Sequence, residues 1–308
     1  MRYLITGGLG FLGSHLCDAL ITAGHEVLGV DSCVIGCARN VKQLGNHPRF
    51  RLEVRDVCTP FDFGKVDGIY HLASPTAPAE TYKHPDMTLK VNSDATGWLL
   101  EAAEQQGARF LFASSIKVND RQTFGSTYIQ GKILGEQFCR ASGFAKVARM
   151  GNVYGPRMAA DDSRVIPTFI RNTINGTPFN VWGDGSQVDA FCFVSDIVTA
   201  LMRLMESEHR GVMELGSPVG ITIQDLACAV MQTNGVDLPI IYDQPGGAAV
   251  VTCQNAAWSS NRTGPALAAK SRKVPDISVA RNYLRWNPAV GLNDGIVKTT
   301  AYYKEILK

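Results

Sequence analysis

Three side chains, Ser115, Tyr128 and Lys132, have the types and the spacing that are needed to remove a proton from an alcohol. Tyr128 and Lys132 are four residues apart, so a helix places the phenol and the ammonium on one face. Ser115 follows residues 109–114, which predict a strand, and open α/β sheets build their sites beyond such strand ends. A phenol has a pKa of about 10, which neighbouring positive charge lowers. We therefore predict Tyr128 as the base, with Lys132 lowering its pKa and Ser115 supplying an orienting hydrogen bond.

A glycine-rich loop stands where a dinucleotide would be bound. Its glycines are three residues apart; they follow residues 3–6, a predicted strand, and open a predicted helix at residues 11–24. Absent side chains let the backbone approach a pyrophosphate, and the helix N-terminus supplies amide donors and partial positive charge. The loop therefore predicts a site for the pyrophosphate of NAD, formed by Gly7, Gly10, Phe11, Leu12 and Gly13.

An acidic residue at the end of the next predicted strand, residues 26–31, selects the cofactor. Asp31 lies 18 residues after the last loop glycine, where a carboxylate accepts both ribose hydroxyls of NAD and repels a 2′-phosphate. No basic residue follows Asp31 before Arg39. We therefore expect NAD rather than NADP. Asp56 and Val57, after the third predicted strand, are expected to contact the adenine ring.

The first half of the chain alternates strands and helices. Strands are predicted at residues 3–6, 26–31, 51–54, 68–72, 109–114 and 146–150, and helices at residues 11–24, 86–106 and 128–141. This alternation predicts an α/β fold with a Rossmann-like, doubly wound parallel sheet. We expect residues 1–160 to form the NAD-binding domain, with segments around 188–215 returning to it.

The spacing changes after about residue 160, which predicts a smaller C-terminal α/β substrate domain over residues 161–308. Ser195 and Thr222 are predicted helix N-caps, the second for a helix that ends near residue 233. Residues 244–269 contain one charged residue, Arg262, and predict a long functional loop. Further helices are predicted at 164–175, 196–205 and 292–307, and short strands at 178–181 and 190–194.

Composition places bounds on the function. The 308 residues are 45% apolar and 19% charged, which is enough for a sizeable core. The 30 basic and 28 acidic residues give a net charge of +2, so there is no strong electrostatic case for nucleic acid or an anionic membrane as a partner. No apolar run approaches the ~18 residues of a membrane span, and we expect no secretory leader before the glycine loop.

The cysteines and histidines do not predict a metal site. Eight cysteines are scattered without a CxxC motif, and no cluster of Cys, His, Asp and Glu has metal spacing. Eight free thiols are typical of a reducing cytoplasm, the compartment that we expect. His71, at the end of an apolar strand, is interpreted as a hydrogen-bonded core residue, and His15 as a packing residue.

Six motifs together resemble the extended short-chain dehydrogenase/reductase family over essentially the whole chain. They are residues 6–13, 71–74, Tyr128 with Lys132, 149–156, 182–187 and 191–196. Residues 71–78 and 275–277 are most similar to the nucleotide-sugar epimerase and decarboxylase type, especially the UDP-glucuronate decarboxylases. The resemblance implies tightly held NAD, a nucleotide-diphosphate sugar as substrate, and a homodimer formed through the helices within 86–106 and 128–141.

The resemblance also implies roles for further residues. Besides the glycine loop, it implies cofactor contacts by Asp31, Ser32, Asp56, Val57, Leu72, Ala73, Ser74, Tyr128 and Lys132. It implies substrate contacts by Thr76, Ser115, Asn152, Arg157, Val165 and Arg272, with Asn152 near the phosphates or the sugar.

The chain departs from the decarboxylase pattern beside the predicted catalytic serine. Family decarboxylases and 4,6-dehydratases have a Glu two residues after this position, where the chain has Lys117, and dehydratases have an Asp where it has Ile116. Residues 115–119 are similar instead to 4-epimerase-like members. Near the phosphates Asp189 replaces an Arg, and the cations that remain as candidates there are Arg262, Arg272 and Lys273.

These features favour one function and leave others open. We favour an NAD-dependent nucleotide-sugar epimerase that forms a transient keto sugar at C4 and returns the hydride to its other face, because this reaction needs no carboxylate at position 117. A UDP-glucuronate decarboxylase, which the overall resemblance favours, is the alternative. A 4,6-dehydratase-like enzyme and a non-enzymatic NAD-binding member of the family stay open, because fold does not fix function.

Overall fold

The computed structural model describes residues 1–120, 124–159, 161–244, 247–253 and 273–307, and it divides the chain into two compact units. Unit 1 consists of Met1–Met150, Ile197–Leu215 and Ser278–Asn287, and unit 2 of Gly151–Asp196, Gly216–Ile277 and Pro288–Lys308. The sequence places the first boundary at residue 160 and the returning segment at 188–215. In the structure, unit 1 ends at Met150 and takes back two segments. Arg272 and most of residues 244–269 lie outside the described residues.

Seven parallel strands form the sheet of unit 1, in the order β10-β6-β5-β4-β1-β2-β3. Because the chain starts in the middle and builds outward to both edges, this is the Rossmann-like, doubly wound sheet that the alternation predicts. The strands are β1 (Arg2–Thr6), β2 (Glu26–Asp31), β3 (Phe50–Val54), β4 (Gly68–His71), β5 (Arg109–Ser115), β6 (Lys146–Met150) and β10 (Gly211–Leu215).

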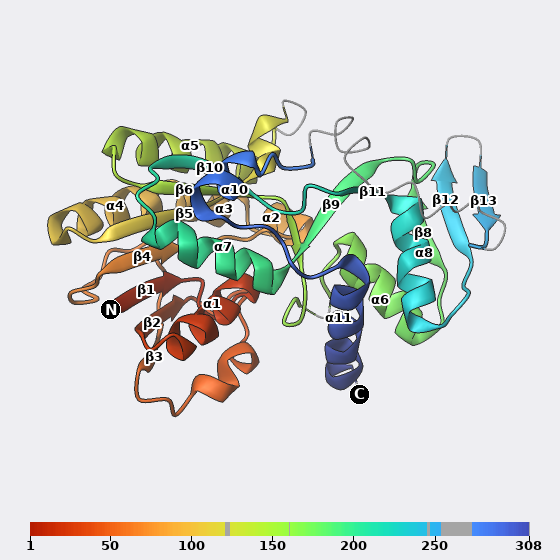
Figure 1. Ribbon diagram of the computed structural model, residues 1–308, viewed down its shortest axis with the longest axis horizontal. Helices are drawn as coiled ribbons and strands as arrows, with labels where there is room; N and C mark the ends of the chain where they lie inside the picture. The colour runs from red at the N-terminus through yellow and green to blue at the C-terminus, as the bar shows by residue number, and fades with distance from the viewer. Residues whose placement is uncertain (121–123, 160, 245–246, 254–272, 308) are drawn as a thin grey trace. The chain divides into compact units, whose positions relative to one another are not determined.

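Helices cover both faces of this sheet. Figure 1 shows α3, α4 and α5 over one face and α1 and α7 over the other. The predicted helix 86–106 is two helices that meet at Ser93, whose hydroxyl donates to the Leu89 carbonyl at 2.9 Å, a contact that often bends a helix. The helices are α1 (Phe11–Thr22), α2 (Pro78–Lys83), α3 (Pro85–Asn92), α4 (Asp94–Gln106), α5 (Thr127–Ser142), α7 (Val194–Glu206) and α10 (Ser278–Leu284), with 3₁₀ turns η1 (Ala38–Leu44) and η2 (Ile116–Asn119).

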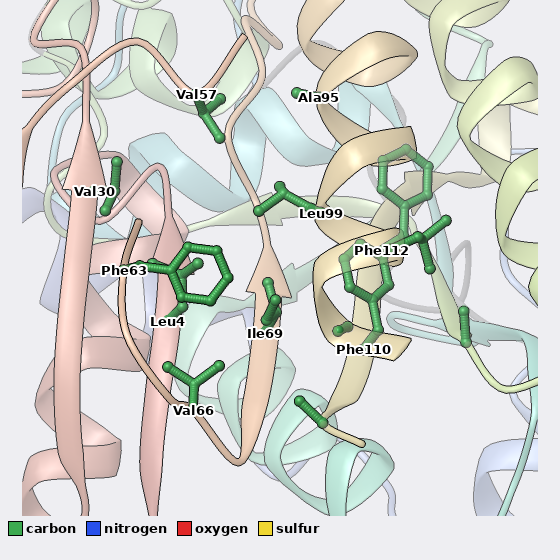
Figure 2. Close-up of a cluster of buried hydrophobic side chains, with 14 of the residues drawn as sticks. Leu4, Val30, Val57, Phe63, Val66, Ile69, Ala95, Leu99, Phe110 and Phe112 are labelled. Atoms are coloured by element: carbon green, nitrogen blue, oxygen red, sulfur yellow. The ribbon is translucent and has the colours of Figure 1, made fainter. Parts of the chain in front are cut away.

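The core of unit 1 lies between the sheet and α4. Figure 2 shows apolar side chains of neighbouring strands facing Ala95 and Leu99 of α4. Leu99 and Phe112 are fully buried, and burying a side chain of this size stabilises the fold by about 1.5–3 kcal/mol. The core therefore fixes α4, and with it the start of β5, against the centre of the sheet.

The glycine loop joins β1 to α1 by close backbone contact. Gly7 has φ +75°, and its N–H and that of Gly8 donate to the Val30 carbonyl at 2.8 and 3.2 Å. A Cβ on Gly13 would overlap the Gly7 carbonyl oxygen. Glycine is therefore required at position 13 by packing within the loop, before any ligand is considered.

Two small sheets and three helices make up unit 2 within the described ranges. Its sheets have the orders β11-β9-β7 and β13-β12-β8. The N-cap prediction for Thr222 is confirmed, because its hydroxyl accepts from the Asp225 N–H at 3.0 Å at the start of α8. The elements are β7 (Asn152–Tyr154), β8 (Phe179–Trp182), β9 (Val188–Phe193), β11 (Gly220–Thr222), β12 (Ile240–Gln244), β13 (Gly247–Val251), α6 (Val165–Asn175), α8 (Ile223–Asn234) and α11 (Leu292–Ile306).

Two local predictions are wrong. Ser195 does not cap a helix, because β9 ends at Phe193 and α7 begins at the next residue, which places Ser195 inside the first turn. The predicted loop 244–269 contains β13, which pairs antiparallel with β12 from Gln244↔Gly247 to Ile240↔Val251. Backbone pairing forms this strand in a sequence of small residues that does not show strand periodicity.

The expectation of eight free thiols is also wrong. Cys228 and Cys253 form a disulfide with a Cα–Cα distance of 5.6 Å, within the usual range for such bonds. The bond ties the end of β13 to α8. The other six cysteines are free, and the cytoplasmic location stays a prediction. Within the described ranges, no helix has the length and apolar character of a membrane span.

The contact between Gly13 and Gly7 generates a prediction. Gly13→Ala should lower the free energy of unfolding by about 1–3 kcal/mol, because the added methyl group forces the loop away from α1. Gly97→Ala on α4 is the matched control, since a Cβ there has no atom within 4 Å, and it should stabilise the helix by about 0.5–1 kcal/mol. Urea unfolding monitored by circular dichroism measures both, and equal effects would refute the packing argument.

Candidate active site

The predicted pyrophosphate loop touches the chain that follows β4. A Cβ on Gly7 would lie 2.9 Å from the backbone N of Ala73, and the Thr6 hydroxyl accepts from that N–H at 3.2 Å. His71 hydrogen-bonds to Thr6 Oγ1 at 2.7 Å and to the Val91 carbonyl oxygen at 2.9 Å. Burial lowers the pKa of His71 to about 3, so it is a neutral core residue, as the sequence indicates. The loop and residues 72–74 thus form one continuous backbone surface.

Asp31 lies beside this surface at the end of β2. Its carboxylate accepts from the N–H of Leu9 at 3.0 Å and of Cys33 at 2.9 Å, on different oxygens. Burial is the largest influence and raises the pKa of Asp31, while these backbone donors lower it. The Gly10 N–H is a third backbone donor to this carboxylate, and since two carboxylate oxygens offer about four acceptor sites, one remains for a hydroxyl donor. Asp31 therefore has the position and the acceptor capacity that binding of a ribose needs.

The remaining predicted cofactor residues follow the strand ends of unit 1. Phe11 and Leu12 form the first turn of α1, and Ser32 is exposed after β2. Asp56 accepts from the Cys58 N–H at 2.9 Å in an exposed turn after β3. The Val57 side chain packs in the core instead of facing solvent (Figure 2), and its predicted contact with adenine stays a prediction.

Asn92 is a candidate cofactor residue that the sequence reasoning missed. Its amide nitrogen donates to Ser74 Oγ at 2.9 Å and to the Thr88 carbonyl at 2.7 Å, while the buried Oδ1 has no hydrogen-bond partner among the described residues. Leaving a buried acceptor unpaired costs about 1–3 kcal/mol, which a hydroxyl donor would recover. Asn92 was missed because its helical context shows nothing unusual.

These features together fit NAD. A glycine loop without side chains, a carboxylate beside it and an unpaired amide oxygen near Ser74 suit a pyrophosphate and ribose hydroxyls. The residues that would hold the cofactor are Gly7, Gly10, Gly13, Asp31 and residues 72–74, with Asn92 beside them.

The predicted catalytic residues lie on β5 and α5. Ser115 ends β5 and caps η2, where its Oγ accepts from the Lys117 N–H at 3.3 Å. Tyr128 is in the first turn of α5, and Lys132 lies one turn later. Lys132 Nζ donates to the Ala113 carbonyl at 2.6 Å and lies 5.5 Å from the centre of the Tyr128 ring. The fold therefore brings the ammonium to the phenol and to the strand end that carries Ser115.

Burial controls the charge of Lys132. The side chain is 2% exposed, and burial lowers the pKa of Lys132 to about 7, while the Glu136 carboxylate acts in the opposite direction. Its Nζ lies 4.8 Å from the centre of the Phe112 ring, which favours the charged form as a cation–π contact. The site thus holds an ammonium that loses its proton far more easily than a surface lysine.

A network of polar side chains continues from the catalytic helix. Ser114 Oγ donates to Glu136 Oε1 at 2.5 Å, and Arg149 binds the same carboxylate through Nε at 2.8 Å and Nη2 at 2.5 Å. Arg149 Nη1 also donates to Asn119 Oδ1 at 2.9 Å, and Asn119 Nδ2 donates to Glu214 at 2.8 Å. The sequence reasoning missed this network, although the four-residue spacing of Lys132 and Glu136 was a usable signal.

The two residues directly after Ser115 supply no carboxylate. Ile116 is 3% exposed, and Lys117 is exposed on η2. Nor do the described residues contain a group of three His, Cys, Asp or Glu side chains placed to hold a metal ion.

The predicted substrate residues are divided between the units. Thr76 is exposed in unit 1, just before α2. In unit 2, Asn152 on β7 donates to the Ala190 carbonyl at 3.3 Å, Arg157 has φ +68°, and Val165 begins α6. Arg272 lies outside the described residues, and the roles of all these residues in binding substrate stay predictions.

Asp189, which replaces the expected Arg, lies on β9 in unit 2. Its carboxylate Oδ1 is 3.8 Å from Lys273 Nζ, and the two side chains are 17% and 47% exposed, respectively. The Lys273 cation is therefore balanced by a neighbouring anion. Unit 2 thus has an anion paired with Lys273 at the position where the resemblance implies an Arg.

Comparisons with known proteins agree with this geometry. UDP-glucuronic acid decarboxylase 1 of Arabidopsis thaliana is 34% identical over 325 residues, covering 99% of this chain and 70% of the relative. The Xenopus tropicalis protein of the same name is 36% identical over 328 residues, covering 100% and 73%. The solved structure of UDP-glucose 4-epimerase from Thermotoga maritima with UDP-glucose has a TM-score of 0.82 and 25% identity, with 100% of each chain covered.

A family model also matches the part of the chain that carries the glycine loop, Asp31 and the Ser115, Tyr128 and Lys132 set. The match extends over residues 3–216, and the model describes the NAD dependent epimerase/dehydratase family. The chain therefore belongs to the NAD dependent epimerase/dehydratase family, and its cofactor is NAD.

Proposed function

We propose that the protein is an NAD-dependent nucleotide-sugar epimerase that acts through a transient 4-keto sugar. The observation that carries this proposal is the intact set of Ser115, Tyr128 and Lys132 beside Lys117, at the position where family decarboxylases have Glu. Epimerisation needs one base that removes and returns a hydroxyl proton, and no second acid. The side chains at this strand end match that requirement.

The chain's own residues account for the proton steps. When bound, NAD would supply the acceptor and donor of the hydride. Tyr128, as phenolate, takes the proton of the C4 hydroxyl and later gives it back. Lys132 stabilises the phenolate through its charge, since its Nζ lies 5.5 Å from the phenol ring centre. Ser115 hydrogen-bonds to the same sugar oxygen and orients it.

The proposed substrate is a nucleoside diphosphate sugar. The curated relatives are named for UDP-glucuronic acid and the structural relative for UDP-glucose, which supports this class. We propose Thr76, Ser115, Asn152, Arg157, Val165 and Arg272 as its binding residues. Because Asp189 balances Lys273, the diphosphate would depend more on Arg157 and on backbone donors.

A UDP-glucuronate decarboxylase is the second candidate, and the names of the relatives at 34% and 36% identity favour it. The same oxidation at C4 of a sugar that has a carboxylate on C5 gives a β-keto acid, which loses carbon dioxide. The two reactions therefore share Tyr128, Lys132 and Ser115 and differ in the step after the oxidation. Lys117 is the residue at which the candidates diverge.

Substitution of the base tests the mechanism. The protein is incubated with a panel of nucleotide sugars deuterated at C4, and the products are followed by NMR. An epimer that retains the label is expected. Tyr128→Phe should lower kcat by about 10²–10⁴-fold or more while NAD stays bound, because it removes the proton acceptor. Tyr283→Phe, at a tyrosine that is 69% exposed, is the matched control and should be fully active.

Other outcomes of this experiment identify other reactions. Carbon dioxide from UDP-glucuronate would identify the decarboxylase, and solvent deuterium at C5 or C6 would indicate dehydration or a different epimerisation centre. Conversion of no substrate by a protein that binds NAD would support a non-enzymatic role. Unchanged turnover in Tyr128→Phe would overturn the assignment of the base.

We also propose that the cofactor preference depends on Asp31. The native protein should bind NAD more tightly than NADP, because the carboxylate repels a 2′-phosphate. Asp31→Ala should weaken NAD binding by about 10–100-fold, since it removes a charged hydrogen-bond acceptor. Calorimetry measures both ligands, with Asp62→Ala, a change at an exposed turn, as the control. Equal affinity of the native protein for NAD and NADP would contradict the proposal.

A homodimer formed through α4 and α5 is a further proposal. The two helices contact each other, and α5 exposes Leu134 (37%) and Phe138 (42%) one turn apart, a pair suited to helix–helix contact. Light scattering should give twice the 33.4 kDa mass of the chain at micromolar concentration. Phe138→Glu should give the monomer, whereas Val54→Glu, at an exposed position on β3, should not. A monomeric native protein would count against the dimer.

A further inference from the structure

Lys132 and Glu136 link the catalytic helix to the end of β5 at two successive residues. Lys132 Nζ donates to the carbonyl of Ala113 at 2.6 Å, and Glu136 Oε1 accepts from the hydroxyl of Ser114 at 2.5 Å. The next residue along the strand is Ser115. Two side chains one helical turn apart therefore fix the register between α5 and the strand end where Ser115 acts.

The Glu136 carboxylate is buried and fully engaged. Its side chain is 7% exposed, and it receives Ser114 Oγ and two nitrogens of Arg149. A buried carboxylate stays ionised when a guanidinium binds it in this two-pronged way. The hydrogen bond to Glu136 is the largest influence that raises the pKa of Arg149. Unit 1 thus contains a carboxylate paired with Arg149 one helical turn from Lys132.

The titratable groups that act on Lys132 lie on β4 and on α5 itself. From β4, His71 is buried and neutral, and from α5 itself burial raises the pKa of Cys139, which leaves a neutral thiol. Among the described residues, Glu136 is thus the anion next to Lys132. The Tyr128 ring centre lies 5.5 Å from Lys132 Nζ, Arg149 on β6 binds Glu136, and Lys117 on η2 is exposed. Lys90 of α3 and Asp94 of α4 influence the pKa of Cys58.

We propose that Glu136 is a positioning residue for catalysis, which holds the Ser115 strand end against α5 and, balanced by Arg149, supplies the negative charge that offsets the burial of the Lys132 ammonium. The proposal deepens the proposed function and depends on that function for one point, the catalytic role of Lys132. The Glu136 side chain touches no reacting atom and acts through Ser114 and Lys132.

The titration of Lys132 supplies a test that needs no substrate. Burial lowers its pKa to about 7 in the folded chain, against about 10.4 in the unfolded chain. Below pH 7 Lys132 is protonated in both the folded and the unfolded chain, and the full cost of burying its charge lowers the stability. Between about pH 7 and 10.4 the folded chain loses this proton while the unfolded chain keeps it, so the stability rises with pH. Lys132→Met removes this dependence, so the difference in unfolding midpoint between the parent and Lys132→Met isolates it.

The experiment measures this difference from pH 5 to 10.5 in the full chain, in native and Glu136→Gln backgrounds. In the native background, the unfolding midpoint of Lys132→Met should exceed that of the parent at low pH, and this difference should begin to fall near pH 7. The pH at which the fall begins is the onset. Glu136→Gln keeps the size of the side chain and removes the charge, so the onset should move down by about 1 pH unit. Arg149→Gln removes the balancing cation and should move the onset up.

Two control variants separate charge from structure. Glu214→Gln makes the same chemical change at the outer end of the network, beyond Asn119, and should not move the onset. Ser114→Ala removes a hydrogen bond to Glu136 and no charge, so it should leave the onset in place while lowering kcat. An unchanged onset in Glu136→Gln, or an equal change in Glu214→Gln, would overturn the proposal.

Catalysis supplies an independent readout. On a substrate found in the panel, Glu136→Gln should move the alkaline limb of the pH profile of kcat/KM down by the same pH interval, because Lys132 then loses its proton earlier. If the panel yields no substrate, the proposed function fails, while the stability titration still decides whether Glu136 controls Lys132.

Discussion

Close backbone contact at the carboxyl edge of the seven-stranded sheet is the constraint on which the rest of unit 1 depends. Gly13 lies against the Gly7 carbonyl, and Gly7 lies against the backbone of Ala73, so neither glycine has room for a side chain. These contacts set the distance between the β1 loop, α1 and the chain after β4. Asp31 belongs to the same surface because the backbone N–H of Leu9, within the loop, donates a hydrogen bond to its carboxylate. The cofactor surface is thus a direct consequence of how the strand ends pack.

Local patterns predicted the elements of unit 1 well and failed where distant packing decides. Strands β2 and β6 have the predicted bounds of 26–31 and 146–150. The apolar run of β2 marks it in the sequence because a strand of a parallel sheet is buried on both faces. No Gly or Pro marks the division of the predicted helix at Ser93, and β13 depends on pairing with β12 rather than on its own residues. Such features have no periodic signal in the sequence.

The same distinction separates the predicted from the missed site residues. The spacing of Tyr128 and Lys132 on one helix and the position of Asp31 after one strand are local properties, so the sequence was sufficient to nominate them. Glu136 is important through its hydrogen bonds with Ser114 and Arg149, which lie 22 and 13 residues away along the chain. Asn119 hydrogen-bonds to Glu214 across 95 residues. The Cys228–Cys253 bond likewise joins residues 25 apart. Only the folded chain makes these partners visible.

The chain builds each unit from three separate stretches, and this limits how the protein can be divided. A fragment that ends at Met150 would lack β10, which pairs along all of β6. Residues 146–150 would then form an open sheet edge with unpaired N–H and C=O groups, a template for aggregation. Neither unit is therefore a transferable module. Exchange of unit 1 between relatives must replace Met1–Met150, Ile197–Leu215 and Ser278–Asn287 together. A single crossover directly after Met150 would separate β6 from its own β10.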